Sequence, residues 1–562
     1  MREAKSAQWQ ALLHFRDGKP RFKSNVFFLS QETSAFSELE ETLQRLKQDP
    51  RYVCRFPARW KYLKSRFPNI PENDEHCTEL RKYRMSVPFD ETSVVYSSEN
   101  LFYPSSMMGH MMLRVAGIKK GVGFVEHGIS FFTELDPWKL PVEIFQSLVG
   151  GKLGFFRVSP YQEKVRQYQE REGRNVWEYQ LMLSKDQRDL LRDHIWELRN
   201  SHLPYFFQSY NCATLTLMLI RVADPTIDEG TAWISPTDVV RLMITSHKIN
   251  KTSVYLARDW KIRMLEESLP GKAIEEVEKL KDHVYHGIKD QSDTDTAYMK
   301  IQLSDAFNDE LFITGEITKE RYAINKKKIT ADLDESRFLD LSTYKSPHRL
   351  APDSQIKLSY QSNGKINISF LPASHRLEDD NRVYHGESGL ELLSTSISMD
   401  REAMRAEVDH LRIYSAQSLL PWSPLTGGKS GQFAIGWEKW VDENLDDRRG
   451  GRIDLGIGFT RQLTGDLGVF GLINGGGVAH SKGYDAFISP TAGLYLYEIF
   501  SMKTLAMFHM TRFLGEKYTL YESKLTQVYY HTPEISFVLE YKHLQSAIKT
   551  SGVFNVGAKL RF

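Results

Sequence analysis

From about residue 350 to its end, the chain alternates apolar residues with polar or small ones. Ile453, Leu455, Ile457 and Phe459 show the pattern, and similar segments recur up to the last residue. A period of two indicates β-strands with one face in an apolar environment and the other in a polar one. Roughly ten to twelve such segments, joined by short polar turns, predict a large antiparallel β-structure over residues 346–562.

Two β-folds alternate in this way, a soluble sandwich and a membrane barrel. The barrel is favoured because the segments approach the roughly nine to eleven residues that a tilted strand needs to cross a bilayer. The apolar face is also rich in Phe, Tyr, Trp and Leu, and the chain ends on Phe562 in an alternating strand. Lys559 and Arg561 would then face a wet lumen. We predict an antiparallel outer-membrane-type β-barrel of about 12 strands.

The composition limits the classes of function. Lys plus Arg number 73 and Asp plus Glu number 72, which gives a net charge of +1. This balance offers no basic surface, so we expect no nucleic-acid partner. The sequence contains no run of about 18 apolar residues, so no transmembrane helix is predicted. The first ten residues lack the apolar core of a signal peptide. Because an outer-membrane barrel must be exported, we expect that a signal peptide has been removed.

Four regions are expected along the chain. Leucines at helical spacing predict a small helical domain over residues 1–90. Residues 91–265 mix strand and helix patterns, and residues 266–345 read as a connector before the barrel over 346–562.

Individual elements can be placed within these regions. Strands are predicted at 93–98, 111–115 and 123–132. Ser184 followed by Gln187 forms a capping box that predicts a helix. Charged residues over 265–290 predict another helix with a solvated face.

Cys212 is the strongest candidate for a reactive side chain. Asn211 is a favoured N-cap and an apolar helical run follows, so Cys212 is expected in the first turn of a helix. The helix dipole and the free N–H groups there stabilise a thiolate. His110, at the start of a strand-like run, is the best candidate for a base. The alternative is that Cys212 is a small buried residue and His110 an ordinary core histidine.

The chain has three cysteines, an odd number. In an exported protein we expect Cys54 to pair with Cys77, leaving Cys212 as a free thiol. Three reduced thiols are the alternative if the protein is not exported. The histidines are scattered and form no ligand-spaced motif, so we predict no metal site and no cofactor.

The middle of the chain resembles a known family in several spaced motifs. They occur in the order Ser106–Arg114, Gly150–Gly154, Tyr168 with Arg174–Tyr179, Leu183–Ser184, Trp196–Leu198 and Tyr210–Cys212. Over roughly residues 90–260 they resemble the Lnb periplasmic domain family, named after the Lnb lipoprotein N-acyltransferases. Cys54–Arg59 and the C-terminal β-structure resemble the flanks of the longer proteobacterial members, which carry an extra N-terminal domain and a C-terminal β-domain.

The resemblance implies a papain-like α+β fold, related to NlpC/P60 proteins, in a permuted order with the histidine before the cysteine. It also implies acyl transfer by Cys212 and His110, the pair that the local pattern singles out. A third residue that orients the imidazole is expected on the strand over 123–132. Ser130 is the preferred candidate, and Glu126 and His127 are the alternatives.

The predicted reaction begins when His110 takes the proton of Cys212, or when the two side chains form a thiolate–imidazolium pair. The thiolate attacks an ester or amide carbonyl, and the resulting thioester passes its acyl group to an amine or to water. N–H groups at the start of the helix are expected to hold the oxyanion. Asn211, Tyr210 and Ser106 are the expected positioning residues.

We therefore predict a thiol acyltransferase or hydrolase anchored in the outer membrane, with its catalytic domain in the periplasm of a Gram-negative bacterium. The expected partners are outer-membrane lipid, a phospholipid or lipoprotein substrate, and the barrel-assembly machinery. Two other functions remain open. One is a peptidoglycan amidase or peptidase of NlpC/P60 type. The other is a non-enzymatic pore or export component with a degenerate papain-like domain.

Overall fold

The computed structural model divides the chain into two compact units, Met1–Ala257 and Arg258–Phe562. The described residues are 2–67, 69–70, 74–99, 109–134, 143, 146–147, 150–201, 203–207, 209–230, 233–287, 294–334, 336–341, 344–400, 404–481 and 483–562.

Short helices open the N-terminal unit. They are α1 (Ala7–Leu12), α2 (Ala35–Gln48), α3 (Arg51–Arg55), α4 (Pro57–Lys64) and α5 (Thr78–Ser86), with a small hairpin of β1 (Phe15–Arg16) and β2 (Lys19–Pro20). Leu39 of α2 and Leu63 of α4 are buried in the same hydrophobic cluster as Val94 of the sheet that follows. The first region is helical, as predicted, and its core is continuous with that of the middle region.

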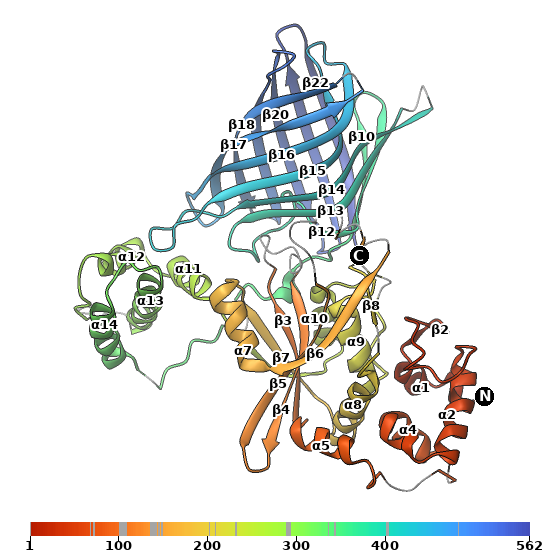
Figure 1. The fold of residues 1–562 in the computed structure, drawn as a ribbon. Helices are drawn as coiled ribbons and strands as arrows, with labels where there is room; N and C mark the ends of the chain where they lie inside the picture. The colour runs from red at the N-terminus through yellow and green to blue at the C-terminus, as the bar shows by residue number, and fades with distance from the viewer. Residues whose placement is uncertain are drawn as a thin grey trace. The chain divides into compact units, whose positions relative to one another are not determined.

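The N-terminal unit continues with a seven-stranded sheet and the helices that cover it (Figure 1). Its strands are β3 (Glu91–Ser97), β4 (His110–Lys119), β5 (Gly123–Phe132), β6 (Lys152–Pro160), β7 (Val176–Leu181), β8 (Leu203–Tyr205) and β9 (Ile249–Tyr255). They lie in the order β8-β6-β5-β4-β3-β7-β9, with antiparallel neighbours throughout. The three strands predicted at 93–98, 111–115 and 123–132 are present as β3, β4 and β5.

The two faces of this sheet pack against different helices. The helices are α7 (Tyr161–Arg166), η4 (Gln167–Arg171), α8 (Lys185–Leu198), α9 (Cys212–Ala223) and α10 (Pro236–Thr245). Met111 of β4 packs in the main core together with α9, whereas Met112 packs with Tyr161 and Tyr168 in a second cluster. Because side chains alternate along a strand, His110 lies on the same face as Met112. The predicted capping box at Ser184 begins α8.

The second unit opens with helices. They are α11 (Arg258–Ser268), α12 (Gly271–Glu278), α13 (Thr294–Ile313) and α14 (Lys319–Asp332), with 3-10 turns at Lys279–Lys281 and Pro347–Arg349. The prediction of one helix over 265–290 is wrong, because Pro270 separates α11 from α12 and proline cannot continue a helix. Among the described residues, no helix is long and apolar enough to span a membrane.

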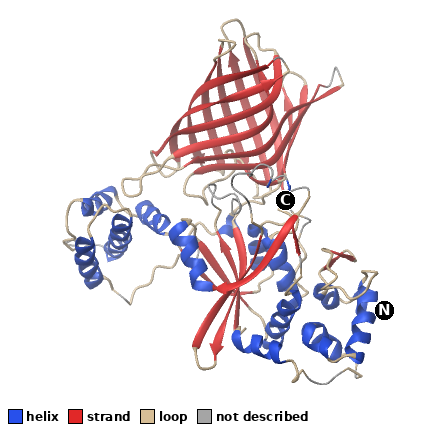
Figure 2. Ribbon diagram, viewed as in Figure 1, coloured by secondary structure: helices blue, strands red, loops and turns tan. Residues whose placement is uncertain are grey.

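The second unit ends in an antiparallel barrel (Figure 2). Its strands are β10 (Gln355–Gln361), β11 (Lys365–Leu371), β12 (Ala373–His375), β13 (Glu387–Asp400), β14 (Arg405–Leu419), β15 (Ser430–Val441), β16 (Asp447–Gln462), β17 (Leu467–His480), β18 (Gly483–Glu498), β19 (Met502–Phe513), β20 (Thr519–Tyr530), β21 (Ile535–Gln545) and β22 (Thr550–Arg561). Strand β22 pairs with β10, and β11 pairs with both β10 and β13, which closes the sheet. The short β12 follows β11 along β13, so the barrel has 12 strands, as predicted.

The alternation in the sequence separates the two faces of the barrel wall. Ile457 is 77% exposed and Phe459 66% exposed, on the outward face. Lys559 and Arg561 are buried and point into the lumen. A closed wall with an apolar outside satisfies every strand hydrogen bond inside a bilayer. The prediction of an outer-membrane-type barrel is confirmed.

Candidate active site

Cys212 is the first residue of α9, as the sequence predicts. The Asn211 side chain caps the helix, because its Oδ1 accepts a hydrogen bond from the Thr214 N–H at 3.0 Å. The Asn211 amide also donates to the carbonyl oxygens of Phe207 at 2.9 Å and Ile234 at 3.0 Å. Both ends of this side chain are therefore used in holding the start of α9.

The Cys212 thiol is the free cysteine of the chain and is buried. Burial raises its pKa above the ordinary value of 9.0. The backbone N–H groups of Met111, Ala213 and Cys212 itself, together with the charge of Arg174, oppose this rise. The Cys212 sulfur therefore lies beside the backbone N–H of Met111, the residue that follows His110 at the start of β4.

His110 is the first residue of β4, and its ring centroid lies 6.4 Å from that of Tyr168. Burial, together with the positive charges of Arg174 and Lys164, lowers the pKa of His110 to about 3. The contacts of the described residues include no direct hydrogen bond between His110 and Cys212. The structure brings the two residues to the same strand end, and their catalytic pairing stays a prediction.

A cavity of about 230 Å³ opens beside His110. Its lining includes His110, Ser130, Phe132, Lys164, Tyr168 and Tyr205. Tyr168 and Tyr205 line this cavity. Burial raises their pKa values, and a negative charge on Cys212 raises them too. A substrate group in this cavity would meet His110, whereas no residue of α9 belongs to the lining.

Among the candidates for a third residue, Ser130 lies in this cavity. It pairs across the strands with Met112, and its hydroxyl lies 3.6 Å from the Met112 sulfur. Glu126 is held by Arg114 at 2.7 Å and by Gln162 at 2.6 Å. His127 is one residue away from Glu126, on the opposite face of β5. Ser130 is therefore the candidate that the structure places nearest to His110.

One of the predicted positioning residues lies elsewhere. Tyr210 is buried in the core, where its ring contacts Phe22 with centroids 6.1 Å apart and Phe131 with centroids 6.0 Å apart. It does not line the cavity beside His110. Ser106 lies outside the described residues.

Arg174 and Tyr168 contribute to the site, although no role was predicted for either residue. The Arg174 guanidinium is fully buried and donates to the carbonyl oxygens of Ser97 at 3.1 Å and Ser98 at 2.5 Å. It also pairs with Glu172 at 3.0 Å and lies 4.9 Å from the Tyr168 ring centroid. Arg174 is thus a fixed positive charge that acts on both Cys212 and His110. In the sequence, Arg174 and Tyr168 stand out only as members of the spaced motifs that carry the family resemblance.

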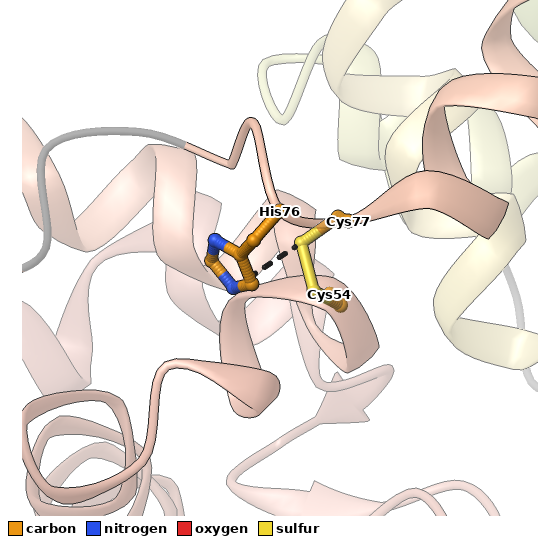
Figure 3. A group of neighbouring side chains, drawn as sticks. All are labelled: Cys54, His76 and Cys77. Carbon is orange, nitrogen blue, oxygen red and sulfur yellow. Dashed lines mark hydrogen bonds between the residues drawn. A yellow bond between two sulfur atoms is a disulfide. The ribbon is translucent and has the colours of Figure 1, made fainter.

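Cys54 and Cys77 are joined by a disulfide, and His76 lies beside it (Figure 3). The His76 Nε2 is 3.6 Å from the Cys77 sulfur. In the described part of the chain, these three residues form the group of potential metal ligands, because one ligand atom of each lies within 4.8 Å of the others. Because both sulfurs are covalently bonded, neither is available as a thiolate ligand for a metal.

Residues 79–246 match the sequence model of the Lnb N-terminal periplasmic domain. This segment is an Lnb periplasmic domain. Two domains of unknown function match the parts on either side, DUF7843 over residues 3–66 and DUF7840 over residues 354–556. No curated protein matches the chain.

The chain is also similar to solved porins, with low scores. The NanC porin is 11% identical, with a TM-score of 0.25, over 37% of this chain and 100% of the porin. The KdgM porin is 11% identical, with a TM-score of 0.24, over 37% of this chain and 99% of the porin. The anion-selective porin from Comamonas acidovorans is 10% identical, with a TM-score of 0.20, over 35% of this chain and 59% of the porin.

The compartment follows from two findings that are independent of those scores. The Lnb domain is a periplasmic domain, and the same chain carries a closed barrel whose outer face is apolar. A barrel of this kind spans the outer membrane. The protein is therefore an outer-membrane protein with its Lnb domain in the periplasm.

Proposed function

We propose that the Lnb domain is a thiol acyltransferase or hydrolase in which Cys212 is the nucleophile and His110 the base. The observation that carries the proposal is the position of the Cys212 sulfur. It lies at the N-terminus of α9, against the N–H group of the residue after His110. A thiol so placed has hydrogen-bond donors for a thiolate and a basic side chain at the same strand end.

The electrostatics favour a neutral pair at rest. The pKa of His110 is about 3, so the imidazole is uncharged at pH 7 and can accept a proton. The pKa of Cys212 is raised, so the thiol keeps its proton. We infer that the proton moves to His110 as the sulfur attacks, rather than in a preformed thiolate–imidazolium pair.

In the proposed reaction the sulfur forms a bond to an ester carbonyl carbon, and the Cys212 proton passes to His110. N–H groups at the start of α9 stabilise the oxyanion, and one such donor contributes about 3 kcal/mol in known enzymes. The tetrahedral intermediate then expels the alcohol, which takes the proton from His110. An amine or water then attacks the thioester carbon while His110 takes its proton. The C–S bond breaks, and the released sulfur of Cys212 takes that proton back from His110.

An apolar groove next to the site supports a lipid substrate. A cavity of about 470 Å³ runs between β6 and the end of α8, and it is lined mainly by apolar side chains such as Leu153, Phe155, Val158 and Trp196. Leu153, Phe155 and Val158 are exposed. The Phe155 ring contacts that of Phe132, which lines the cavity beside His110, with centroids 6.1 Å apart. An acyl chain could leave the reacting carbonyl over Phe132 and lie in this groove.

The test is to incubate the purified full-length protein with a phospholipid of defined chains, quench in acid and measure peptide masses. We expect an acyl group on Cys212 in the wild type and none in Cys212→Ala. His110→Gln should lose the adduct, whereas His127→Gln, one strand away, should keep it. Persistence of activity without any adduct on Cys212 would contradict the proposal. Cleavage of peptidoglycan fragments without a lipid adduct would instead favour the amidase.

A further inference from the structure

A segment outside the strands crosses the lumen of the barrel. Residues 376–386, here called the plug segment, connect β12 to β13 at the end where β10 begins. Within it Leu377, Asp379 and Asn381 are buried. β10 is the first barrel strand after the periplasmic Lnb domain in the chain, so the end of the barrel at which β10 begins is the periplasmic one.

Asp379 fixes the plug segment to β22 and β10. Its Oδ1 accepts hydrogen bonds from Lys559 Nζ at 2.7 Å and from Arg561 Nη2 at 2.7 Å. Its Oδ2 accepts from Gln355 Nε2 at 2.9 Å. Lys559 and Arg561, which the sequence predicts to face a wet lumen, are therefore both paired with the Asp379 carboxylate of the plug segment.

Other strands hold the backbone of the plug segment. Lys503 of β19 donates to the carbonyl oxygens of Leu377 at 2.6 Å and Asp379 at 2.8 Å. The Tyr530 hydroxyl of β20 donates to the Glu378 carbonyl oxygen at 2.8 Å. The Asn381 N–H donates to the Tyr497 hydroxyl of β18 at 2.9 Å. Strands β18, β19 and β20 thus hold the plug segment from the side of the barrel opposite β13, where the segment ends.

Leu377 adds an apolar seal. It is buried in one cluster with wall residues of β14, β17, β18 and β19, namely Leu419, Phe470, Leu472, Tyr495, Tyr497 and Leu505. On the far side of the plug segment the lumen holds a cavity of about 730 Å³, lined largely by polar and charged side chains such as Arg412, Glu438, Arg452, Glu522 and Lys542. None of the residues 376–386 lines that cavity.

We propose that the barrel is a closed anchor rather than a passage. The plug segment blocks the lumen at the periplasmic end and leaves a polar chamber beyond it. Removing it would leave Lys559 and Arg561 without their carboxylate partners and would leave Lys503 with Glu387 of β13 but without its two carbonyl partners, which is costly where these cations are buried. The same contacts therefore keep the plug segment in place and disfavour the pore function.

The test is ion conductance of the full-length protein in planar lipid bilayers. We expect no conductance steps from the wild type. A variant in which residues 377–385 are replaced by a Gly-Ser segment of equal length keeps the connection but loses the wall contacts of Leu377, Asp379 and Asn381, and it should conduct. Asp379→Ala, a smaller change, should give brief openings. Lys542→Met is the matched control, since it removes a luminal lysine that pairs with Glu522 at 2.9 Å, and it should stay silent.

A gel-shift on heating identifies the folded barrels among these variants. Steady conductance of the wild type would overturn the proposal. Silence of the Gly-Ser and Asp379→Ala variants, both folded, would also overturn it, because the lumen would then be closed elsewhere. These outcomes do not depend on the activity of Cys212.

Discussion

Removal of the Cys54–Cys77 disulfide should destabilise the N-terminal unit by a measurable amount. The bond joins α3 to the residue that precedes α5, with 23 residues of sequence separation. In the chain-entropy account, a loop of about 24 residues stabilises the folded state by ~3 kcal/mol at 25 °C. Cys77 is also part of the main core, so its replacement by Ala adds a small loss of packing.

The N-terminal helices provide the structural reason for this effect. The Cys54 carbonyl oxygen accepts a hydrogen bond from Trp196 Nε1 of α8 at 2.7 Å. The neighbouring Arg55 donates to the Glu197 carbonyl oxygen at 2.7 Å. The disulfide thus closes a loop whose ends pack on the helix that supports the sheet. Loosening α3 should therefore be felt in the core of the whole N-terminal unit.

The assay is urea unfolding in detergent, followed by tryptophan fluorescence. The variant with Cys54→Ala and Cys77→Ala should lose ~3 kcal/mol of unfolding free energy relative to the wild type. Cys212→Ala is the control, because it removes a buried thiol without opening a loop. Wild type treated with a reducing agent should behave like the double variant. A loss below ~1 kcal/mol, or one equal to that of the control, would refute the loop argument.

Burial raises the pKa of Cys212, so its alkylation by iodoacetamide should still accelerate above pH 9.0, and a plateau below about pH 8 would contradict this. Burial raises the pKa of Glu197 from 4.5 to about 7, so the folded protein holds a proton that the unfolded chain releases. That stabilisation is full below pH 4.5 and lost by pH 7, so urea unfolding should show Glu197→Gln gaining ~3 kcal/mol on the wild type over this range. A Cβ at Gly154 would overlap the Phe131 ring, so Gly154→Ala should cost ~1–3 kcal/mol. Gly271→Ala, with no atom within 4 Å, should leave the Tm unchanged.

The start of α9 shows how local interactions make part of a site readable. The cap joins Asn211 to Thr214, three residues on, so residue types alone predict it. The sequence therefore predicted that Cys212 begins a helix. It could not predict that the Met111 N–H reaches the sulfur, because Met111 and Cys212 lie far apart in the chain and meet only through the packing of α9 on β4.

Arg174 illustrates the part of the site that sequence reasoning missed. Its guanidinium is buried among carbonyl oxygens of Ser97 and Ser98, and its charge acts on both Cys212 and His110. A single arginine in a strand-like stretch gives no sign of such burial, since arginines are mostly exposed. Only the pairing of β3 with β7 brings these segments together.

The sequence by itself determined the barrel, because each residue of a membrane strand faces either lipid or lumen, and that choice is written into every second position. It also determined the capped helix that begins at Cys212. The tertiary structure alone decided what fills the lumen and what surrounds the thiol. The plug segment has no periodic pattern, and its anchors Lys503 and Lys559 come from strands that are distant in the chain. Contacts of that kind depend on which strands become neighbours, and no local pattern records them.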